Sequence, residues 1–169
     1  MENKESSRRL PVQSGNDGAA RLLADPGDGF RENRRSGTLR ILVMDDDPVL
    51  RRVLDKMLSN LDCEVITVVS GEQAIQTLGE ARRRNIHYDA AMLDLTVPGG
   101  KGGKKIVADI KSLFPEIKTI AMSGYTCDPV FDAPGAFGFH CCLKKPFLID
   151  ELSSLLNEIA ALKFNSPSK

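Results

Sequence analysis

The sequence lacks an excess of either charge and lacks any long apolar run. Lys and Arg together number 23, and so do Asp and Glu. A broad surface for nucleic acid or for an anionic membrane would need a basic excess, so we expect neither as a direct partner. The N-terminus shows no apolar stretch of the signal-peptide type, and no run reaches the roughly 18 apolar residues of a membrane span. These absences predict a soluble protein of the cytoplasm.

The sequence contains four cysteines but lacks the C-x-x-C spacing that is typical of zinc and redox sites. Cys141 and Cys142 are neighbours in an expected strand, where adjacent side chains point to opposite faces, so they make a poor disulfide pair. We therefore expect these two thiols, together with Cys63 and Cys127, to be free and buried or half-buried in a reducing compartment.

The first part of the chain lacks a regular apolar pattern. Residues 1–38 have few apolar side chains and no sustained period of 2 or 3.6, which is typical of a disordered tail or linker. A regular pattern begins at Leu39 and ends near the C-terminus. The sequence therefore predicts one domain over residues 39–163, followed by a short tail of residues 164–169.

Within this domain, short apolar runs alternate with helical periodicities. The runs predict buried strands over residues 40–44, 64–69, 90–93, 119–122 and 139–143. Helices are predicted from Pro48 with Asp47 as N-cap, after a capping box at Ser70, over residues 104–114, near residues 128–129 and over residues 149–162. The first helix should turn one apolar stripe inward: Leu50, Val53, Leu54, Met57, Leu58 and Leu61. This alternation predicts an α/β fold with a doubly wound, mainly parallel sheet.

Polar residues stand where the predicted strands end, which is where open parallel sheets bind ligands. They are Asp45 and Asp46 after the first strand, Asp94 after the third, Ser123 after the fourth, and Lys144 or Lys145 after the fifth. Two carboxylates about 4 Å apart repel by roughly 4 kcal/mol at an effective dielectric near 20, so this cluster needs a compensating cation. Carboxylate oxygens suit Mg²⁺, with Mn²⁺ as an alternative.

Such a cluster also suits phosphoryl transfer, because that reaction needs little beyond a nucleophile, positioning and charge neutralisation. Asp94 would be the nucleophile that forms an acyl phosphate. The metal ion and a lysine ammonium would neutralise the phosphoryl oxygens, and the Ser123 hydroxyl would donate a hydrogen bond to one of them.

Four motifs in this order resemble the response-regulator receiver family of two-component signalling. They are ILVMDDDP at residues 41–48, DLTVPG at 94–99, SGY at 123–125 and KPF at 145–147. The resemblance covers about residues 39–163. The longer stretch DLTVPGGKGG, followed by SGY and by DPV at 128–130, resembles most the receivers of hybrid sensor histidine kinases. The resemblance implies a flavodoxin-like, five-stranded parallel sheet of order 2-1-3-4-5 with helices on both faces.

The resemblance also implies roles for single residues. Asp46 would bind Mg²⁺ directly and Asp45 more through water, and the backbone carbonyl of Thr96 would be a further ligand. Asp94 would be the phospho-acceptor and a metal ligand. Lys145 would contact the phosphoryl group, with the bond to Pro146 in cis, and Ser123 would be the switch hydroxyl.

The family further implies a signalling module rather than an enzyme, one that catalyses only its own phosphorylation and dephosphorylation. The phosphoryl donor would be the phosphohistidine of a sensor histidine kinase or of a histidine phosphotransfer protein. The face formed by the fourth helix, fifth strand and fifth helix would rearrange and contact a downstream protein or form a homodimer. Cys142 stands where the family usually has a switch Tyr or Phe, which questions the ring movement and not the phosphorylation.

Two other functions remain open at this stage. DDDPV at residues 45–49 also fits the nucleophile motif of haloacid-dehalogenase-like phosphohydrolases, with Asp45 as nucleophile. Such an enzyme needs a later acidic pair at a strand end, whereas Asp150 and Glu151 fall at the start of a predicted helix. The second alternative is a receiver-like module that binds partners without being phosphorylated.

Overall fold

The sheet is built around two strands that are buried along their whole length. The computed structural model describes residues 38–164, which leaves nearly all of the expected tails at 1–38 and 164–169 outside the described residues. Five parallel strands pair in the order β2-β1-β3-β4-β5, as predicted. Their bounds are Arg40–Met44 for β1, Glu64–Val68 for β2, Ala90–Asp94 for β3, Lys118–Ser123 for β4 and Cys141–Lys144 for β5.

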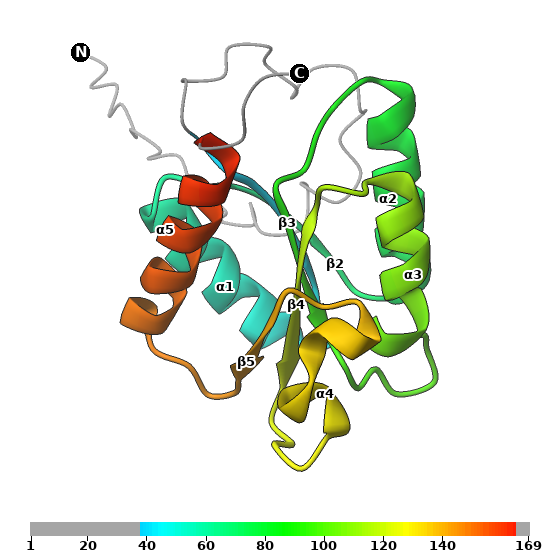
Figure 1. The fold of residues 1–169 in the computed structure, drawn as a ribbon, viewed down its shortest axis with the longest axis vertical. Helices are drawn as coiled ribbons and strands as arrows, with labels where there is room; N and C mark the ends of the chain where they lie inside the picture. The colour runs from blue at the N-terminus through cyan, green and yellow to red at the C-terminus, as the bar shows by residue number, and fades with distance from the viewer. Residues whose placement is uncertain (1–37, 165–169) are drawn as a thin grey trace, which may run out of the picture. The chain divides into compact units, whose positions relative to one another are not determined.

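Helices cover both faces of this sheet (Figure 1). One face carries α1 (Pro48–Asn60) and α5 (Ile149–Phe164). The other carries α2 (Gly71–Arg83), α3 (Gly103–Leu113) and α4 (Pro129–Asp132). The order of strands and the two helical layers confirm the predicted flavodoxin-like α/β fold. None of the helices in the described part of the chain is long and apolar enough to cross a bilayer.

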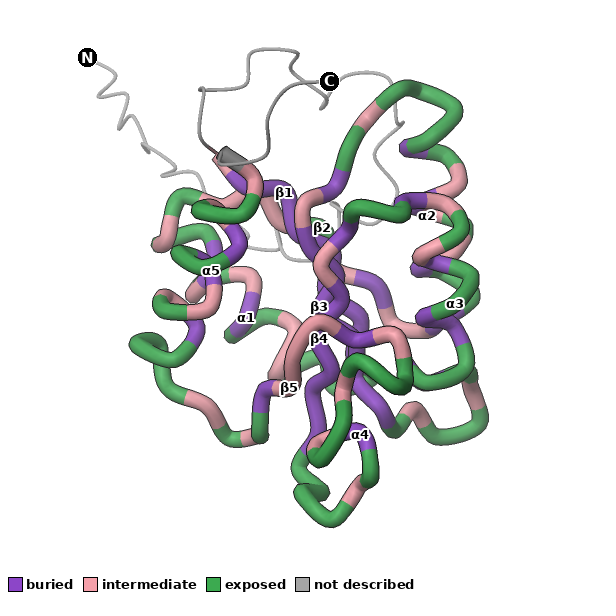
Figure 2. The backbone as a smooth tube through the Cα atoms, in the orientation of Figure 1, coloured by how far each residue is buried: buried purple, intermediate pink, exposed green. Residues whose placement is uncertain are grey.

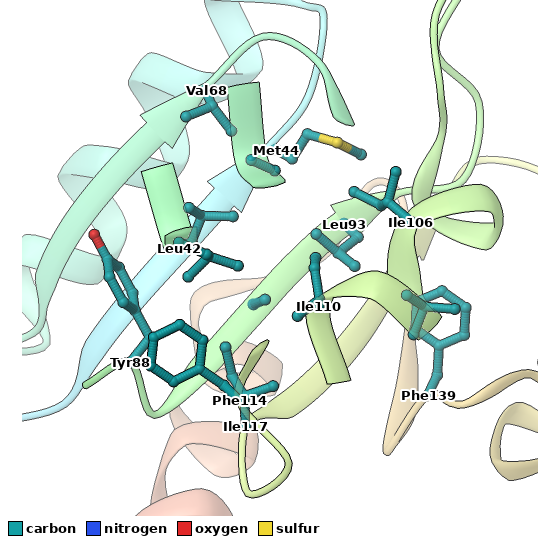
Figure 3. Close-up of a cluster of buried hydrophobic side chains, with 14 of the residues drawn as sticks. Leu42, Met44, Val68, Tyr88, Leu93, Ile106, Ile110, Phe114, Ile117 and Phe139 are labelled. Carbon is teal, nitrogen blue, oxygen red and sulfur yellow. The ribbon is translucent and has the colours of Figure 1, made fainter. Parts of the chain in front are cut away.

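The alternation of side chains along each strand supplies one hydrophobic core per face. In β1, Leu42 and Met44 join the cluster under α2 and α3, while Ile41 and Val43 join the cluster under α1 and α5. The central strands are accordingly buried throughout (Figure 2). Figure 3 shows the first cluster, where Ile106 and Ile110 of α3 pack over the sheet with Leu42 and Leu93. Packing on both faces holds the strand ends in fixed positions.

The helix starts follow the predicted capping chemistry, with one departure. The Asp47 carboxylate accepts hydrogen bonds from the N–H groups of Val49 at 2.8 Å and Leu50 at 3.4 Å, which confirms it as the N-cap of α1. Ser70 caps α2 by accepting from the N–H of Gln73 at 3.4 Å. The Gln73 side chain, however, accepts from the N–H of Val69, one residue before the position that a capping box uses.

Two details of the sequence prediction are wrong. Val53 is 45% exposed, because Leu54 faces the sheet and Val53 lies about 100° around the helix from it. Cys127 is exposed, because it falls in the loop between β4 and α4, whereas the other three cysteines are half-buried as expected. All four thiols are free, as predicted. The helix predicted to begin near residues 128–129 does begin there, with Asp128 as its N-cap, and it is a single turn that is followed by a short 3₁₀ helix, η2 (Pro134–Phe137).

Candidate functional site

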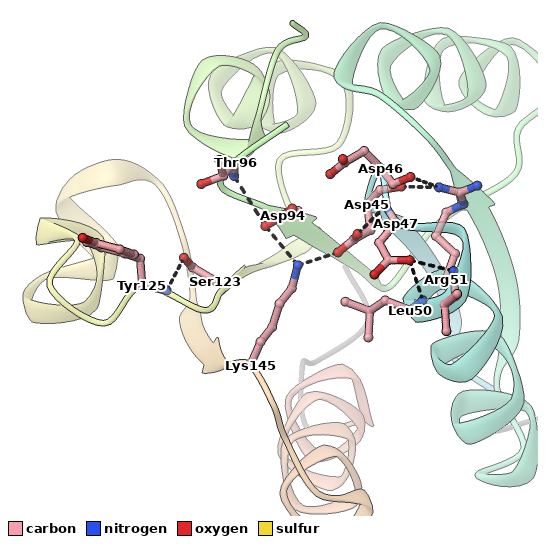
Figure 4. Close-up of polar contacts among 11 residues, drawn as sticks. Asp45, Asp46, Asp47, Leu50, Arg51, Asp94, Thr96, Ser123, Tyr125 and Lys145 are labelled. Atoms are coloured by element: carbon pink, nitrogen blue, oxygen red, sulfur yellow. Dashed lines mark hydrogen bonds and ion pairs between the residues drawn. The ribbon is translucent and has the colours of Figure 1, made fainter. Parts of the chain in front are cut away.

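The pairing of β1 with β3 brings three carboxylates together at the carboxyl ends of the strands. Met44 lies opposite Leu93 in the sheet, so the residues that follow them, Asp45 and Asp94, are neighbours. One carboxylate oxygen from each of Asp45, Asp46 and Asp94 lies within 4.8 Å of the others. Asp45 is 1% exposed and Asp94 is 6% exposed, whereas Asp46 is open to solvent. Figure 4 shows the three side chains around one point.

A single ammonium group bridges two of these carboxylates. Lys145 Nζ lies 2.6 Å from Asp45 Oδ2 and 3.1 Å from Asp94 Oδ1. The peptide bond from Lys145 to Pro146 is cis, as the resemblance implied. The strand pattern alone left Lys144 as the other candidate lysine. Lys144 is the exposed last residue of β5, and both ion pairs to Asp45 and Asp94 come from Lys145. The side chain at the site is therefore that of Lys145.

Hydrogen bonds fix the two buried carboxylates. Asp45 Oδ1 accepts from the N–H of Asp47 at 2.9 Å, so both of its oxygens have a donor. Asp94 Oδ1 accepts from the N–H of Thr96 at 3.4 Å in addition to its ion pair. Burial raises the pKa of Asp94, and Lys145 offsets only part of that rise. The charged carboxylate of Asp94 is thus held at some cost in a place where a bound cation would stabilise it.

Ser123 and Thr96 lie at the ends of the neighbouring strands. Ser123 is 3% exposed at the end of β4, and its hydroxyl oxygen accepts from the N–H of Tyr125 at 2.9 Å. A hydroxyl that accepts through one lone pair still has its hydrogen to donate. Thr96 is exposed two residues after Asp94, on the loop that leads to α3. Thr96 thus contacts the acidic cluster through its N–H, and Ser123 directly follows Met122, which pairs with Asp94 across β3 and β4.

The arrangement fits a magnesium ion by its donor chemistry. All three clustered side chains offer carboxylate oxygens, and Mg²⁺ prefers oxygen ligands while keeping several waters. Two of the carboxylates share one ammonium group and the third, from Asp46, lies beside them, which leaves negative charge for a divalent cation to neutralise. Asp47 does not belong to this cluster, because its carboxylate caps α1.

Two features of the site were missed from the sequence. Arg51 Nη1 donates to the backbone carbonyls of Asp45 at 2.7 Å and Asp46 at 2.9 Å, which no motif indicated. Gly102 and Gly103 lie so close to the end of β3 that a Cβ atom at either would collide with Leu95 or Leu93. The GGKGG run could have indicated this close approach, because glycine is the residue that allows it.

Cys142 lies on the side of the site toward α4. Its thiol donates to the carbonyl of Val130 at 3.3 Å, so it joins β5 to the single turn of α4. Val130 itself is fully buried. Where the family usually has an aromatic ring, this chain therefore has a small side chain in direct contact with the helix backbone.

Comparisons with known sequences point to one family. The family model described as response regulator receiver domain matches residues 41–157. Protein PilG of Pseudomonas aeruginosa is 30% identical over 139 residues, which cover 80% of this chain and 93% of PilG. Transcription factor SKN7 of Chaetomium thermophilum is 27% identical over 148 residues, covering 88% of this chain and 19% of SKN7. Sensor protein TorS of Escherichia coli is 23% identical over 128 residues, which cover 76% of this chain and 14% of TorS. The chain thus spans about a fifth or less of the length of SKN7 and TorS.

Solved structures agree with the sequence relatives. The receiver domain of a sensor histidine kinase from Pseudomonas aeruginosa, which has a magnesium ion in its active-site cleft, is 25% identical with a TM-score of 0.63 and covers 73% of this chain and 98% of that one. Response regulator TrrA of Thermotoga maritima, in complex with Mg²⁺ and BeF, is 25% identical with a TM-score of 0.60 and covers 72% and 99%.

The fold, the acidic cluster and these matches lead to one assignment. The family model spans more than half of the 169 residues. Its receiver domains are signalling modules, and the strand order found here is theirs. The chain therefore belongs to the response regulator receiver domain family.

Proposed function

We propose that this chain accepts a phosphoryl group on Asp94 from the phosphohistidine of a sensor histidine kinase or a histidine phosphotransfer protein, with Mg²⁺ bound. The observation that carries this proposal is the shared ammonium of Lys145, 2.6 Å from Asp45 and 3.1 Å from Asp94, beside a third carboxylate from Asp46. A stability role would leave this excess of negative charge unexplained.

In the proposed reaction, a carboxylate oxygen of Asp94 attacks the phosphorus atom of the phosphohistidine. A P–O bond forms and the P–N bond breaks, and its electron pair goes to the imidazole nitrogen, which takes up a proton. Asp45, Asp46, Asp94 and the backbone carbonyl of Thr96 would hold Mg²⁺, and the bound ion would supply charge neutralisation for the phosphoryl oxygens. Mn²⁺ is the alternative metal.

The remaining groups of this chain act on the phosphoryl oxygens. Lys145 already lies between Asp45 and Asp94, so its ammonium can follow the charge from the carboxylate to the acyl phosphate. The Ser123 hydroxyl donates its free hydrogen to another oxygen and draws the turn at Tyr125 with it. That turn leads into α4, so the face of α4, β5 and α5 changes for a downstream partner or a second copy of the chain.

We infer that residues 39–163 are the receiver, that residues 1–38 and 164–169 are tails, and that the chain works in the cytoplasm. Hydrolysis with Asp45 as nucleophile is disfavoured, because both of its oxygens already have a donor and it is 1% exposed.

The test is phosphorylation with acetyl phosphate and with candidate kinases in the presence of Mg²⁺, followed by intact mass. We expect the parent chain to gain one phosphoryl group and Asp94→Asn to gain none. Asp47→Asn is the matched control, because this neighbouring aspartate caps α1 and an asparagine can do the same. Labelling of Asp94→Asn as well as the parent would refute the acceptor assignment, and no labelling of the parent would favour an unphosphorylated binding module.

A further inference from the structure

Arg51 donates two hydrogen bonds to backbone carbonyls next to the acidic cluster, although its side chain is not one of the carboxylates or the lysine that form the cluster. It is the fourth residue of α1, and its own N–H donates to the carbonyl of Asp47 at 3.0 Å. Helical side chains lean toward the N-terminus, which brings the guanidinium back over the loop between β1 and α1. There Nη1 donates to the carbonyls of Asp45 and Asp46, at 2.7 Å and 2.9 Å (Figure 4).

These two carbonyls belong to the peptide units on either side of the Asp46 Cα atom. When both units are held, the backbone angles of Asp46 are held, and with them the direction of its Cβ atom. Asp45 is already fixed by Lys145 and by the N–H of Asp47. Asp46, by contrast, is exposed, so the backbone contacts of Arg51 supply the constraint that its side-chain surroundings do not.

We propose that Arg51 is a positioning residue that presents Asp46 to the metal ion, and so sets the magnesium affinity of this site without touching the metal. This inference rests on the proposed function, because it needs Mg²⁺ as the ligand. A guanidinium suits the task, because it is always charged and its nitrogens donate in fixed directions. Partners that orient metal ligands in this way typically change metal affinity by roughly 10- to 100-fold when they are removed.

The experiment is a titration of the ¹⁵N-labelled full chain with MgCl₂ alone, followed by NMR, since the sequence has no tryptophan for a fluorescence signal. Arg51→Gln is compared with Arg52→Gln, which removes the same charge from the next, exposed position of α1. We expect Arg51→Gln to raise the Kd for Mg²⁺ by about ten-fold relative to Arg52→Gln. Arg51→Lys, which keeps the charge and one donor group, should recover part of the affinity and also serves if the glutamine variant does not fold.

The outcomes separate three explanations. Equal Kd values for Arg51→Gln and Arg52→Gln would overturn the inference, whether they match the parent or shift together, because the second case would reflect bulk charge. A fall in melting temperature of Arg51→Gln with an unchanged Kd would also overturn it and leave a structural role only. If the parent chain itself bound no Mg²⁺, the proposed function would fail before the question about Arg51 arose.

Discussion

The strands begin at one end of the sheet, here called the amino edge, and finish at the other, the carboxyl edge. The two edges contain similar charged residues but pair them differently. At the amino edge, two carboxylates each have a cation of their own: Glu64 accepts from Arg40 Nε at 2.7 Å, and Asp89 Oδ1 lies 2.9 Å from Lys163 Nζ. At the carboxyl edge, Asp45 and Asp94 share the ammonium of one lysine, with a third carboxylate beside them.

The difference separates charge that stabilises the fold from charge that awaits a ligand. The charge of a carboxylate that has its own cation is already balanced. Ion pairs of this kind near the surface contribute little to the free energy of unfolding. Where three carboxylates lie around one ammonium group, negative charge remains in excess, because the ammonium offsets only part of their mutual repulsion. Mutations that break or complete each arrangement should therefore act differently at the two edges.

The largest effect on stability is expected from removing the shared cation. Lys145→Met would leave Asp45, which is 1% exposed, and Asp94 buried without their ammonium. Breaking a buried pair from one side typically costs about 3–5 kcal/mol, so we expect a loss of that order in metal-free buffer. Urea unfolding with EDTA measures it, and Lys144→Met, at the exposed neighbouring position, is the control. Equal losses for the two variants would mean that the shared ammonium does not stabilise the cluster.

The rate at which each cysteine is alkylated depends on the burial and charge around it, and this rate should differ between the two edges. Cys63 lies at the amino edge, where burial and the nearby acids Asp62 and Asp89 raise its pKa from 9.0 to about 11. Since the thiolate is the reactive form, this rise in pKa lowers the thiolate fraction of Cys63 about 100-fold near pH 8. Cys127, in the exposed loop at the carboxyl edge, should therefore be alkylated first.

Peptide mapping after timed iodoacetamide treatment measures this order. Raising the pH from 8 to 10 should increase the rate at Cys63 by about ten-fold per unit, because the pH stays below its pKa of about 11. Labelling of Cys63 as fast as Cys127 at pH 8 would contradict the burial found at this edge.

A smaller effect of unusual sign is expected from Asp94→Asn without metal. Burial raises the pKa of Asp94 despite Lys145, so the charged form is disfavoured in the folded chain. Replacing it by a neutral isostere should raise the free energy of unfolding by about 1 kcal/mol, because a charge no longer has to be buried and its repulsion by Asp45 is removed. Saturating Mg²⁺ should reverse the order of the two proteins, since only the parent has the full set of ligands. Urea unfolding with EDTA and with Mg²⁺ tests both halves, and a destabilised variant in EDTA would contradict the reasoning.

Much of this contrast follows from the sequence, because strand ends are marked where an apolar run meets a polar residue. The run at residues 40–44 stops at Asp45, and the run at 90–93 stops at Asp94. Parallel pairing of the two strands then places these residues side by side. The choice of Lys145 over Lys144 came from the resemblance and not from the strand pattern, which could not tell which lysine turns inward.

Features that depend on the reach of a long side chain, or on a loop, could not be predicted. Arg51 looks like any solvated arginine of an amphipathic helix until the loop before it is folded back. Cys127 was expected to be buried or half-buried like most free cysteines, yet its loop leaves it exposed. Both errors arise because periodicity describes which face of an element is apolar and says nothing of the paths between elements.

The smallest effect should come from neutralising a carboxylate at the balanced edge. Glu64 is 41% exposed and paired with Arg40, so Glu64→Gln removes a pair that solvent already screens, and we expect a loss below about 1 kcal/mol. The sign is opposite to that for Asp94→Asn, and the loss should be the same with and without Mg²⁺, because Glu64 lies at the other end of the strands. Urea unfolding under both conditions measures this. If Glu64→Gln were instead stabilising, the amino edge would also hold unfavourable negative charge, and the imbalance at the carboxyl edge would no longer distinguish it as the place for a ligand.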